Sequence, residues 1–190
     1  MSDSVRADTN PATTTNGIPV GTWISDKVHS TFDFSARHMV VATYHGSLPD
    51  FDVTVVGNED GTARLEASAR IGSVKTAEEN LTGHLLSPDF FDAEKFPEVR
   101  FIATDITRDG DHVVVRGQLT AKGITKDVTF HGEIVGPAFA FEDQEKLGLT
   151  LETTMDRREF DMHWNATLPT GGLVLGNEVK LVANLELNRA

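Results

Sequence analysis

The sequence has no cysteine, a single tyrosine and no long apolar run. Without cysteine the chain cannot form disulfides, thiolate zinc sites or thiol nucleophiles. The first twenty residues contain no apolar segment of the length that a secretory signal needs. No stretch approaches the roughly 20 apolar residues of a membrane-spanning helix. We therefore expect a soluble, cytoplasmic protein that does not span a membrane.

Positive charge is also scarce, with 17 lysines and arginines against 29 aspartates and glutamates and a formal charge of −12. An acidic surface repels phosphate backbones, which argues against a nucleic-acid partner. The same charge disfavours docking of a basic patch on anionic membranes. It does not bear on a buried apolar site, which depends on volume and not on net charge.

The chain divides into a tail and one domain. Residues 1–20 are rich in threonine, asparagine, aspartate and proline and lack periodicity, which predicts a disordered N-terminal tail. Residues 21–190 show no change of composition and no internal repeat, so we expect one domain.

Alternation with period two is the main signal in this domain, and it is typical of strands with one buried face. Within residues 62–71 one face carries Ala63, Leu65, Ala67, Ala69 and Ile71, and the other carries polar residues. The pattern recurs in residues 127–134, 147–151 and 179–187, with further candidate strands at 22–35, 45–57, 97–107 and 112–121. Turn residues separate these segments, so the sequence predicts a mainly all-β fold of about eight antiparallel strands.

Residues 76–95 break the alternation. Leu81, Leu85 and Leu86 have helical spacing, and Thr76 followed by Glu79 fits a capping box. We expect a helix over 77–86 and a helical turn near 88–93, inserted between two strands.

Several inward-facing positions hold small residues, namely Ala63, Ala67, Ala69, Ala103, Gly117, Gly132 and Ala183. A solid core would fill such positions with larger side chains, and the interior of an eight-stranded barrel is about wide enough for one small ligand. Two interpretations stay open: the small residues line a cavity, or they match large residues across a filled core.

The chain carries a series of short motifs. They are D-K-V-H-S at 26–30, F-S-A-R-H at 34–38, H-L-L-S-P-D-F-F-D at 84–92, G-Q-L-T-A-K-G-I-T at 117–125, R-E-F at 158–160, W-N at 164–165 and G-G-L-V-L-G at 171–176. Each motif alone is weak, but their order and spacing resemble the YceI family from Trp23 to Leu187.

The resemblance implies an extended antiparallel barrel of eight strands, similar to a lipocalin and partly closed by the short helical insert. Family members are similar to carriers of polyisoprenoid chains such as a quinone tail, and no enzymatic activity is established for the family as a class. The resemblance thus implies an isoprenoid lipid as partner, no cofactor and a homodimer. Three features depart from the family: Leu81-Thr82 replaces an Arg-Asp pair, Asp161 replaces a glycine, and no leader is visible.

A polyprenyl chain has no hydrogen-bonding groups, so it needs a long apolar tunnel. The tunnel candidates are Phe32, Phe34, Phe51, Phe101 and Phe130, with Leu85, Leu86, Phe90 and Phe91 of the insert as a cap. The head-group candidates from the matched motifs are Arg37, His38, Arg158, Trp164 and Asn165. The alternatives are core packing for the phenylalanines, a salt bridge for Arg158 and a turn for Trp164-Asn165.

Three other functions remain as alternatives. Catalysis finds little support, because alternation points Ser30 away from His29 and Asp33, and the chain has neither a nucleophile elbow nor a phosphate or dinucleotide loop. A metal site would need His29, His38 and His45 to converge across strands, since no pair has ligand spacing on one element. A partner-binding barrel with a filled interior is the third. We expect no catalytic residue and no metal.

Overall fold

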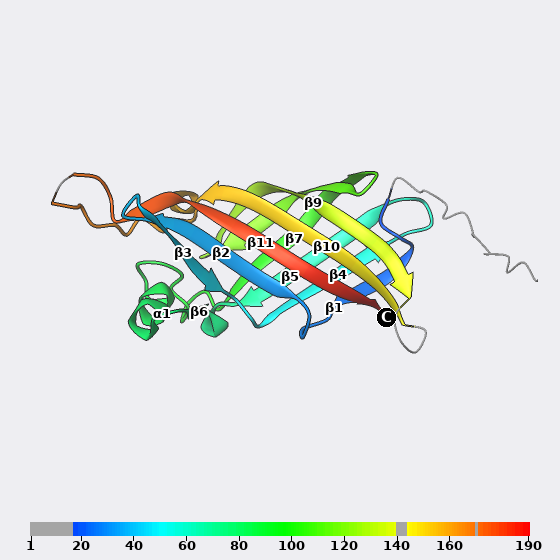
Figure 1. Ribbon diagram of the computed structural model, residues 1–190, viewed down its shortest axis with the longest axis horizontal. Coiled ribbons are helices and arrows are strands. Elements are labelled where there is room, and N and C mark those ends of the chain that lie inside the picture. Colours follow the sequence, from blue (N-terminus) through cyan, green and yellow to red (C-terminus); the bar gives the residue numbers. More distant parts are fainter. Residues whose placement is uncertain (1–16, 140–143, 170) are drawn as a thin grey trace, which may run out of the picture.

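The computed structural model describes residues 17–139, 144–169 and 171–190. Its strands form one antiparallel sheet that curls into an elongated barrel (Figure 1). The strands are β1 (Gly21–Ser25), β2 (Thr31–His38), β3 (Ala42–Ser47), β4 (Phe51–Gly57), β5 (Ala63–Arg70), β6 (Lys75–Thr76), β7 (Glu98–Asp109), β8 (His112–Ala121), β9 (Ile124–Phe139), β10 (Glu145–Asp156) and β11 (Leu175–Arg189). The helices are η1 (Ile71–Ser73), α1 (Glu79–Leu86) and η3 (Arg157–Phe160).

The barrel closes through β1, which pairs with both β4 and β11. Trp23 lies opposite Val55 on one side and Arg189 on the other. Further along β11 its partner is β2, and β3 pairs with β2. β1 with β2, β3 with β4, and β5 with β6 therefore act as three interrupted strands in a closed eight-stranded barrel, which confirms the predicted fold.

The predicted strand at 22–35 is broken by a turn at 26–30. The Asp26 carboxylate accepts a hydrogen bond from the Val28 backbone N–H at 2.9 Å, which folds the chain back locally. Ser30 Oγ then donates to the Glu186 carbonyl at 3.2 Å and accepts from the Glu186 N–H at 3.0 Å. These bonds fix the point where β1 gives way to β2. The predicted strand at 45–57 is likewise broken, between β3 and β4.

One end of the barrel is filled. Trp23, Ile134, Leu147 and Leu187 are fully buried there, and Trp23 Nε1 donates to the Pro19 carbonyl at 2.9 Å. The folded domain thus begins a few residues before the predicted boundary at residue 21, whereas residues 1–16 of the predicted tail lie outside the described residues.

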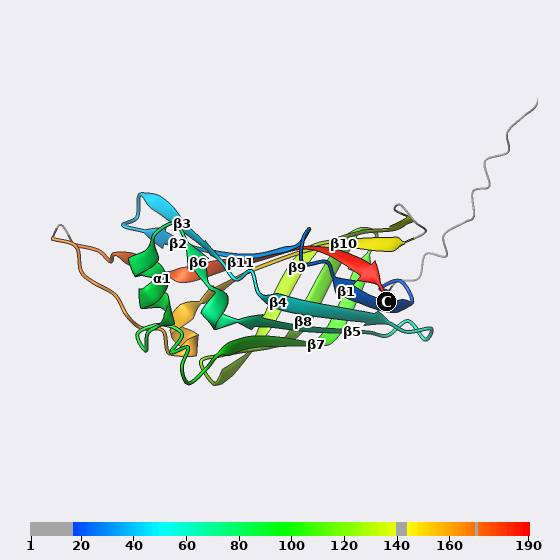
Figure 2. The ribbon, with the colours of Figure 1, turned by 90° about the horizontal axis from the view of Figure 1, so that it is seen from below.

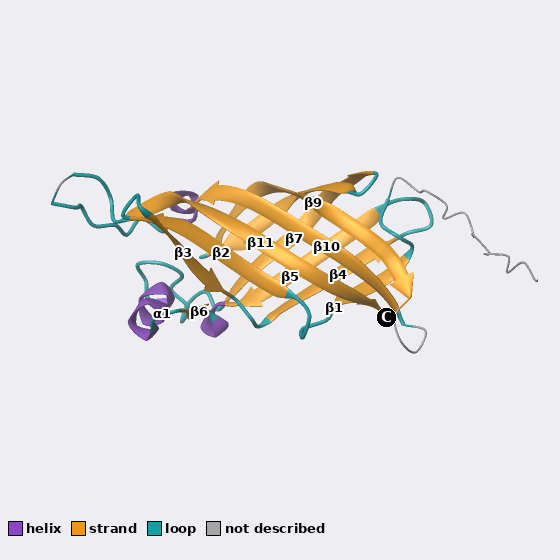
Figure 3. Ribbon diagram, in the orientation of Figure 1, coloured by secondary structure: helices purple, strands orange, loops and turns teal. Residues whose placement is uncertain are grey.

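The other end carries the irregular elements. Figure 2 shows α1, the segment after it and the loop that follows η3 gathered there, opposite the C-terminus. Figure 3 shows that this end holds the helices, while the long sides of the barrel are strands. In the described part of the chain, no helix combines the length and apolar character needed to cross a bilayer.

Helix α1 ends at Leu86 as predicted, but it begins later and its cap differs. The Glu78 carboxylate accepts from the backbone N–H groups of Asn80 and Leu81, and Thr76 Oγ1 instead bonds the Glu78 carbonyl. The predicted capping box is therefore wrong. The predicted helical turn near 88–93 is a set of hydrogen-bonded turns, such as Phe90 N–H to the Ser87 carbonyl.

The small inward residues serve two purposes. A Cβ on Gly117 would lie 2.3 Å from the Ile102 carbonyl oxygen and 2.6 Å from Phe101 Cζ, so this glycine makes room for the neighbouring backbone and for an aromatic ring. A Cβ on Gly132 would lie 1.7 Å from the Thr150 carbonyl oxygen, so here two backbones come close. Ala67 and Ala183, in contrast, border a small empty chamber. The small residues thus match large or closely packed neighbours at Gly117 and Gly132, and they border empty space at Ala67 and Ala183.

Candidate functional site: an apolar cavity at the open end of the barrel

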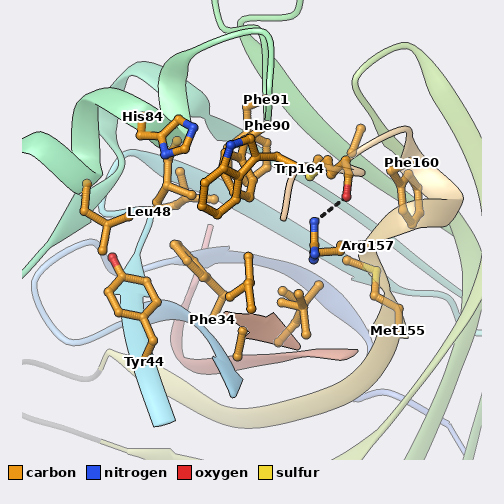
Figure 4. Close-up of a pocket in the computed structure, with 18 of the residues that line it drawn as sticks. Phe34, Tyr44, Leu48, His84, Phe90, Phe91, Met155, Arg157, Phe160 and Trp164 are labelled. Carbon is orange, nitrogen blue, oxygen red and sulfur yellow. Dashed lines mark hydrogen bonds between the residues drawn. The ribbon is translucent and has the colours of Figure 1, made fainter. Parts of the chain in front are cut away.

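A cavity of about 380 Å³ opens at the end of the barrel that carries α1 (Figure 4). Its size falls in the range of roughly 300–1,000 Å³ that is typical of small-molecule sites. Strands β2, β3, β10 and β11 supply one side. Strands β7 and β8, α1 with the turn after it, η3 and the segment before β11 supply most of the rest. Most lining side chains are aliphatic or aromatic, so the site favours an apolar ligand.

The floor is shaped by close packing of Phe34 against the next strand. A Cβ on Gly46, its partner in β3, would lie 2.3 Å from Phe34 Cζ. Glycine at this position therefore lets the ring lie flat along the sheet, where it faces the cavity in Figure 4.

An aromatic cluster forms the roof. The His84 ring packs edge-to-face on Trp164 with centroids 4.6 Å apart and on Phe90 at 5.0 Å. His84 Nε2 also lies 3.0 Å from the Asp89 carboxylate, which fixes the imidazole. The cluster ties α1 to the turn after it and to the loop before β11, so three irregular segments cover the cavity together.

Beyond the cavity lies a smaller chamber of about 60 Å³ toward the filled end. Phe32, Val99 and Leu119 border both spaces. The ring pair Phe101 and Phe130, with centroids 5.0 Å apart, lines the inner chamber. The two spaces together mark an apolar path along the barrel axis.

Among the described lysines, arginines, aspartates and glutamates, Arg157 is the one that lines this apolar cavity. Arg157 is 3% exposed and donates from Nε to the Gly176 carbonyl at 3.0 Å and from Nη1 to the Met162 carbonyl at 2.5 Å. Figure 4 draws the guanidinium at the cavity wall with one of these bonds as a dashed line. Burial lowers the pKa of Arg157 from its ordinary value, the carboxylate of Asp156 opposes this, and the group stays protonated at neutral pH.

Tyr44 brings a polar atom to the opposite wall in Figure 4. Its hydroxyl is buried and has no hydrogen-bond partner among the described residues. The Thr76 hydroxyl is near, but it bonds the Glu78 carbonyl and Thr82 Oγ1. Burial raises the pKa of Tyr44 from its ordinary value, and the neighbouring Thr76 offsets this in part. The hydroxyl is therefore neutral at pH 7.

A model of the YceI-like domain matches residues 23–187. The chain belongs to the YceI-like family. It is 34% identical over 166 residues to a UPF0312 protein of Staphylococcus aureus strain MRSA252, covering 86% of this chain and 95% of that protein.

Two solved structures share the YceI-like fold. BcnA of Burkholderia cenocepacia superposes with a TM-score of 0.71 at 18% identity, over 87% of this chain and 99% of that one. A polyisoprenoid-binding domain from Saccharophagus degradans superposes with a TM-score of 0.61 at 10% identity, over 90% of this chain and 99% of that one. At these identities the likeness concerns the barrel fold.

Most of the predicted site residues of this YceI-like chain meet at the two apolar spaces. The residues at the large cavity are Phe32, Phe34, His38, Leu85, Phe90, Phe91 and Trp164. The residues at the inner chamber are Phe32, Phe51, Phe101 and Phe130. Leu86 instead packs against the core beside the cavity.

Three predicted head-group residues lie elsewhere. Arg37 is exposed and donates to Thr43 Oγ1 and the Val40 carbonyl. Arg158 points outward, where it forms a salt bridge to Asp156 at 2.5 Å. Asn165 bonds both the N–H and the carbonyl of Leu175, which is the turn role that was its alternative.

Sequence reasoning missed Arg157, although the signal was present. The alternation of Leu147, Leu149 and Leu151 continues through Met155 to residue 157, which puts Arg157 inward and Arg158 outward. The motif match pointed to Arg158 because a motif compares residue types and does not take into account which face of the strand each residue occupies.

The histidines of this YceI-like barrel do not converge. Within the described residues, the one group of three candidate ligand atoms is Asp26, His29 and Glu186, without His38 or His45. The Lys146 ammonium lies 2.5 Å from Glu186 and 3.6 Å from Asp26, so a cationic side chain already pairs with both carboxylates. Hydrogen bonds from His29 and Val28 hold the pKa of Asp26 far below its usual range. We interpret the group as an ionic tie between β1, β10 and β11.

Proposed function

We propose that this protein binds an isoprenoid-type lipid, with its tail in the barrel, and that binding rather than catalysis is its function. The observation that carries the proposal is the apolar cavity of about 380 Å³, followed by the inner chamber on the same path. The solved domain of similar fold that is described as polyisoprenoid-binding supports it. No cofactor besides the lipid is needed.

Burial of apolar area drives such binding. Each Å² of tail removed from water contributes about 25 cal/mol, less the cost of ordering a flexible chain. The branched methyl groups of a prenyl chain suit a cavity lined by ring edges, because they fill the gaps between Phe34, Phe90 and Phe91.

The partner-binding alternative requires a filled interior, which does not match the cavity at the open end. It would gain weight only if the barrel ignored lipids.

Fluorescence of the two tryptophans gives a direct test. Trp164 lines the cavity, whereas Trp23 is fully buried at the filled end. Titration with geranylgeraniol should change the emission of the wild type in a saturable way. In Trp164→Phe this change should vanish, while calorimetry still detects binding.

A straight-chain alcohol of equal carbon number is the matched control. We expect it to bind more weakly than geranylgeraniol. Absence of saturable binding of either alcohol to the folded protein would overturn the proposal, and equal affinity would overturn its isoprenoid part.

A further inference from the structure

The charge balance of the cavity is unusual for an apolar site. Among the described residues that line it, Arg157 is the one arginine or lysine, and none is an aspartate or glutamate. The nearest acid along the chain, Asp156, has its carboxylate held by Nε and Nη2 of Arg158. The bonds of Arg157 run to the neutral oxygens of Gly176, Met162 and Asn177.

Neutral partners satisfy N–H groups, and the nearby Asp156 carboxylate is hydrogen-bonded to Arg158, so the positive charge of Arg157 is compensated only in part. A buried charge without a counter-ion is unfavourable, and proteins retain one where it has a partner of opposite charge. A guanidinium has five N–H groups, of which three bond protein oxygens here. One N–H on each Nη atom is left without a protein acceptor in the described structure, and guanidinium groups commonly bind the oxygens of a phosphate or carboxylate.

The rest of the cavity fits the same arrangement. Helix α1 contributes Leu81 and Leu85, which are apolar, and its His84 is held by Asp89. The Tyr44 side chain lines the cavity, and its hydroxyl is buried without a partner in the described structure. The cavity therefore offers donors and positive charge to a ligand, and it offers no anionic acceptor.

We propose that the cavity selects lipids with an anionic head group, a phosphate or carboxylate, that is held by the guanidinium of Arg157. This inference rests on the proposed lipid-binding function. It assigns Arg157 as the residue that determines head-group specificity, with the tail running toward the inner chamber.

The test compares geranylgeranyl monophosphate with geranylgeraniol by isothermal titration calorimetry on the full chain. The wild type should bind the phosphate at least about tenfold more tightly than the alcohol, as expected for a buried charge pair. In Arg157→Met the affinity for the monophosphate should fall to that for the alcohol, and the affinity for the alcohol should not change. Arg157→Lys should keep part of the preference.

Arg116→Met is the matched control, because this arginine of β8 faces solvent, where it pairs with Asp105, and it should leave both affinities unchanged. Equal affinities of the wild type for the two probes would overturn the inference and leave lipid binding standing. An equal loss of affinity for both probes in Arg157→Met would also overturn the inference, because a purely structural role of Arg157 gives that result. Inorganic phosphate binding as tightly as the prenyl phosphate would overturn it in favour of a free-anion site. Failure of both prenyl probes would overturn the proposed function as well.

Discussion

At the scale of residues, single atoms set the polarity of the cavity. The hydroxyl of Tyr44 is buried without a protein partner, so it contributes nothing to folding and adds the cost of its lost hydration. Tyr44→Phe should leave the free energy of unfolding unchanged or raise it by about 1 kcal/mol. Urea denaturation measures this. A loss of stability would show that the hydroxyl has a structural partner.

Gly132 marks the closest approach of two barrel strands. A Cβ there would lie 1.7 Å from the Thr150 carbonyl oxygen, which cannot move without breaking the pairing of β9 and β10. Gly132→Ala should lower the free energy of unfolding by about 3 kcal/mol or more. Gly83→Ala in α1, where no atom lies within 4 Å of the added Cβ, should raise it by about 0.5–1 kcal/mol. Equal effects of the two substitutions in denaturant titrations would contradict the close approach.

Which residues reach the cavity could be predicted in part. Phe34 follows from its place in a matched motif, Phe32 from its place two residues earlier on the same face of the strand, and both line the cavity. Arg158 was chosen in place of Arg157 because a motif gives no direction to a side chain, whereas the strand period does. The Tyr44 hydroxyl could not be found from the sequence, since burial of one atom depends on three segments that meet only in the fold.

At the scale of elements, α1 behaves as part of a cover. Leu81, His84 and Leu85 face the cavity, and the helix is only eight residues long. Such a short helix is unstable alone, so its cap and its packing hold it in place. The sequence predicted the helix from its leucine spacing. It did not reveal the cap, because Glu78 acts through its side chain at a position where serine or threonine is more common.

Removal of this cap should loosen the cover and leave the barrel intact. In Glu78→Ala the N–H groups of Asn80 and Leu81 lose their acceptor, so we expect faster amide exchange in α1 and faster release of bound lipid. Hydrogen exchange and stopped-flow displacement measure the two effects. Glu79→Ala is the control because its carboxylate caps no backbone group in the described structure, and a similar effect of both substitutions would contradict this role of Glu78.

Acid should mimic the substitution. The backbone N–H groups of Asn80 and then Leu81 lower the pKa of Glu78 from its ordinary 4.5. A carboxyl whose pKa is lowered by folding stabilises the fold above its ordinary pKa and ceases to do so as the pH falls through the lowered one. The difference in lipid release between wild type and Glu78→Ala should therefore be full above about pH 5 and shrink below pH 4. A constant difference across this range would show that the charge plays no part.

At the scale of the molecule, the barrel has three zones along its axis: the covered cavity, the small inner chamber and the filled end. Ala67 borders the inner chamber on β5. Ala67→Trp should fill this chamber, so prenyl alcohols of four isoprene units should bind more weakly while those of two bind as before. Calorimetry with both alcohols checks this, and Glu66→Trp on the outer face is the control. Equal binding of the longer alcohol to wild type and Ala67→Trp would show that the tail does not enter the chamber.

The closed barrel itself was predictable, because period-two alternation and the order of the motifs both specify it. The place of the main cavity was not. Small inward residues suggested a cavity beside them, yet Gly117 and Gly132 allow close packing instead. The larger space lies at the end, among bulky side chains such as Met155 and Trp164. Bulky residues leave a cavity when irregular segments hold them apart, and the alternation of residues along the strands does not indicate where this happens.

Homodimerisation stays a prediction, which analytical ultracentrifugation would test.

Native mass spectrometry of the untagged protein, followed by solvent extraction of what it carries, tests the central claim most directly. We predict a mass increment that corresponds to one isoprenoid-type lipid per chain, released on denaturation and identified in the extract. A folded barrel that carries no such lipid, and takes none up when incubated with excess prenyl phosphate and prenyl alcohol, would contradict the account.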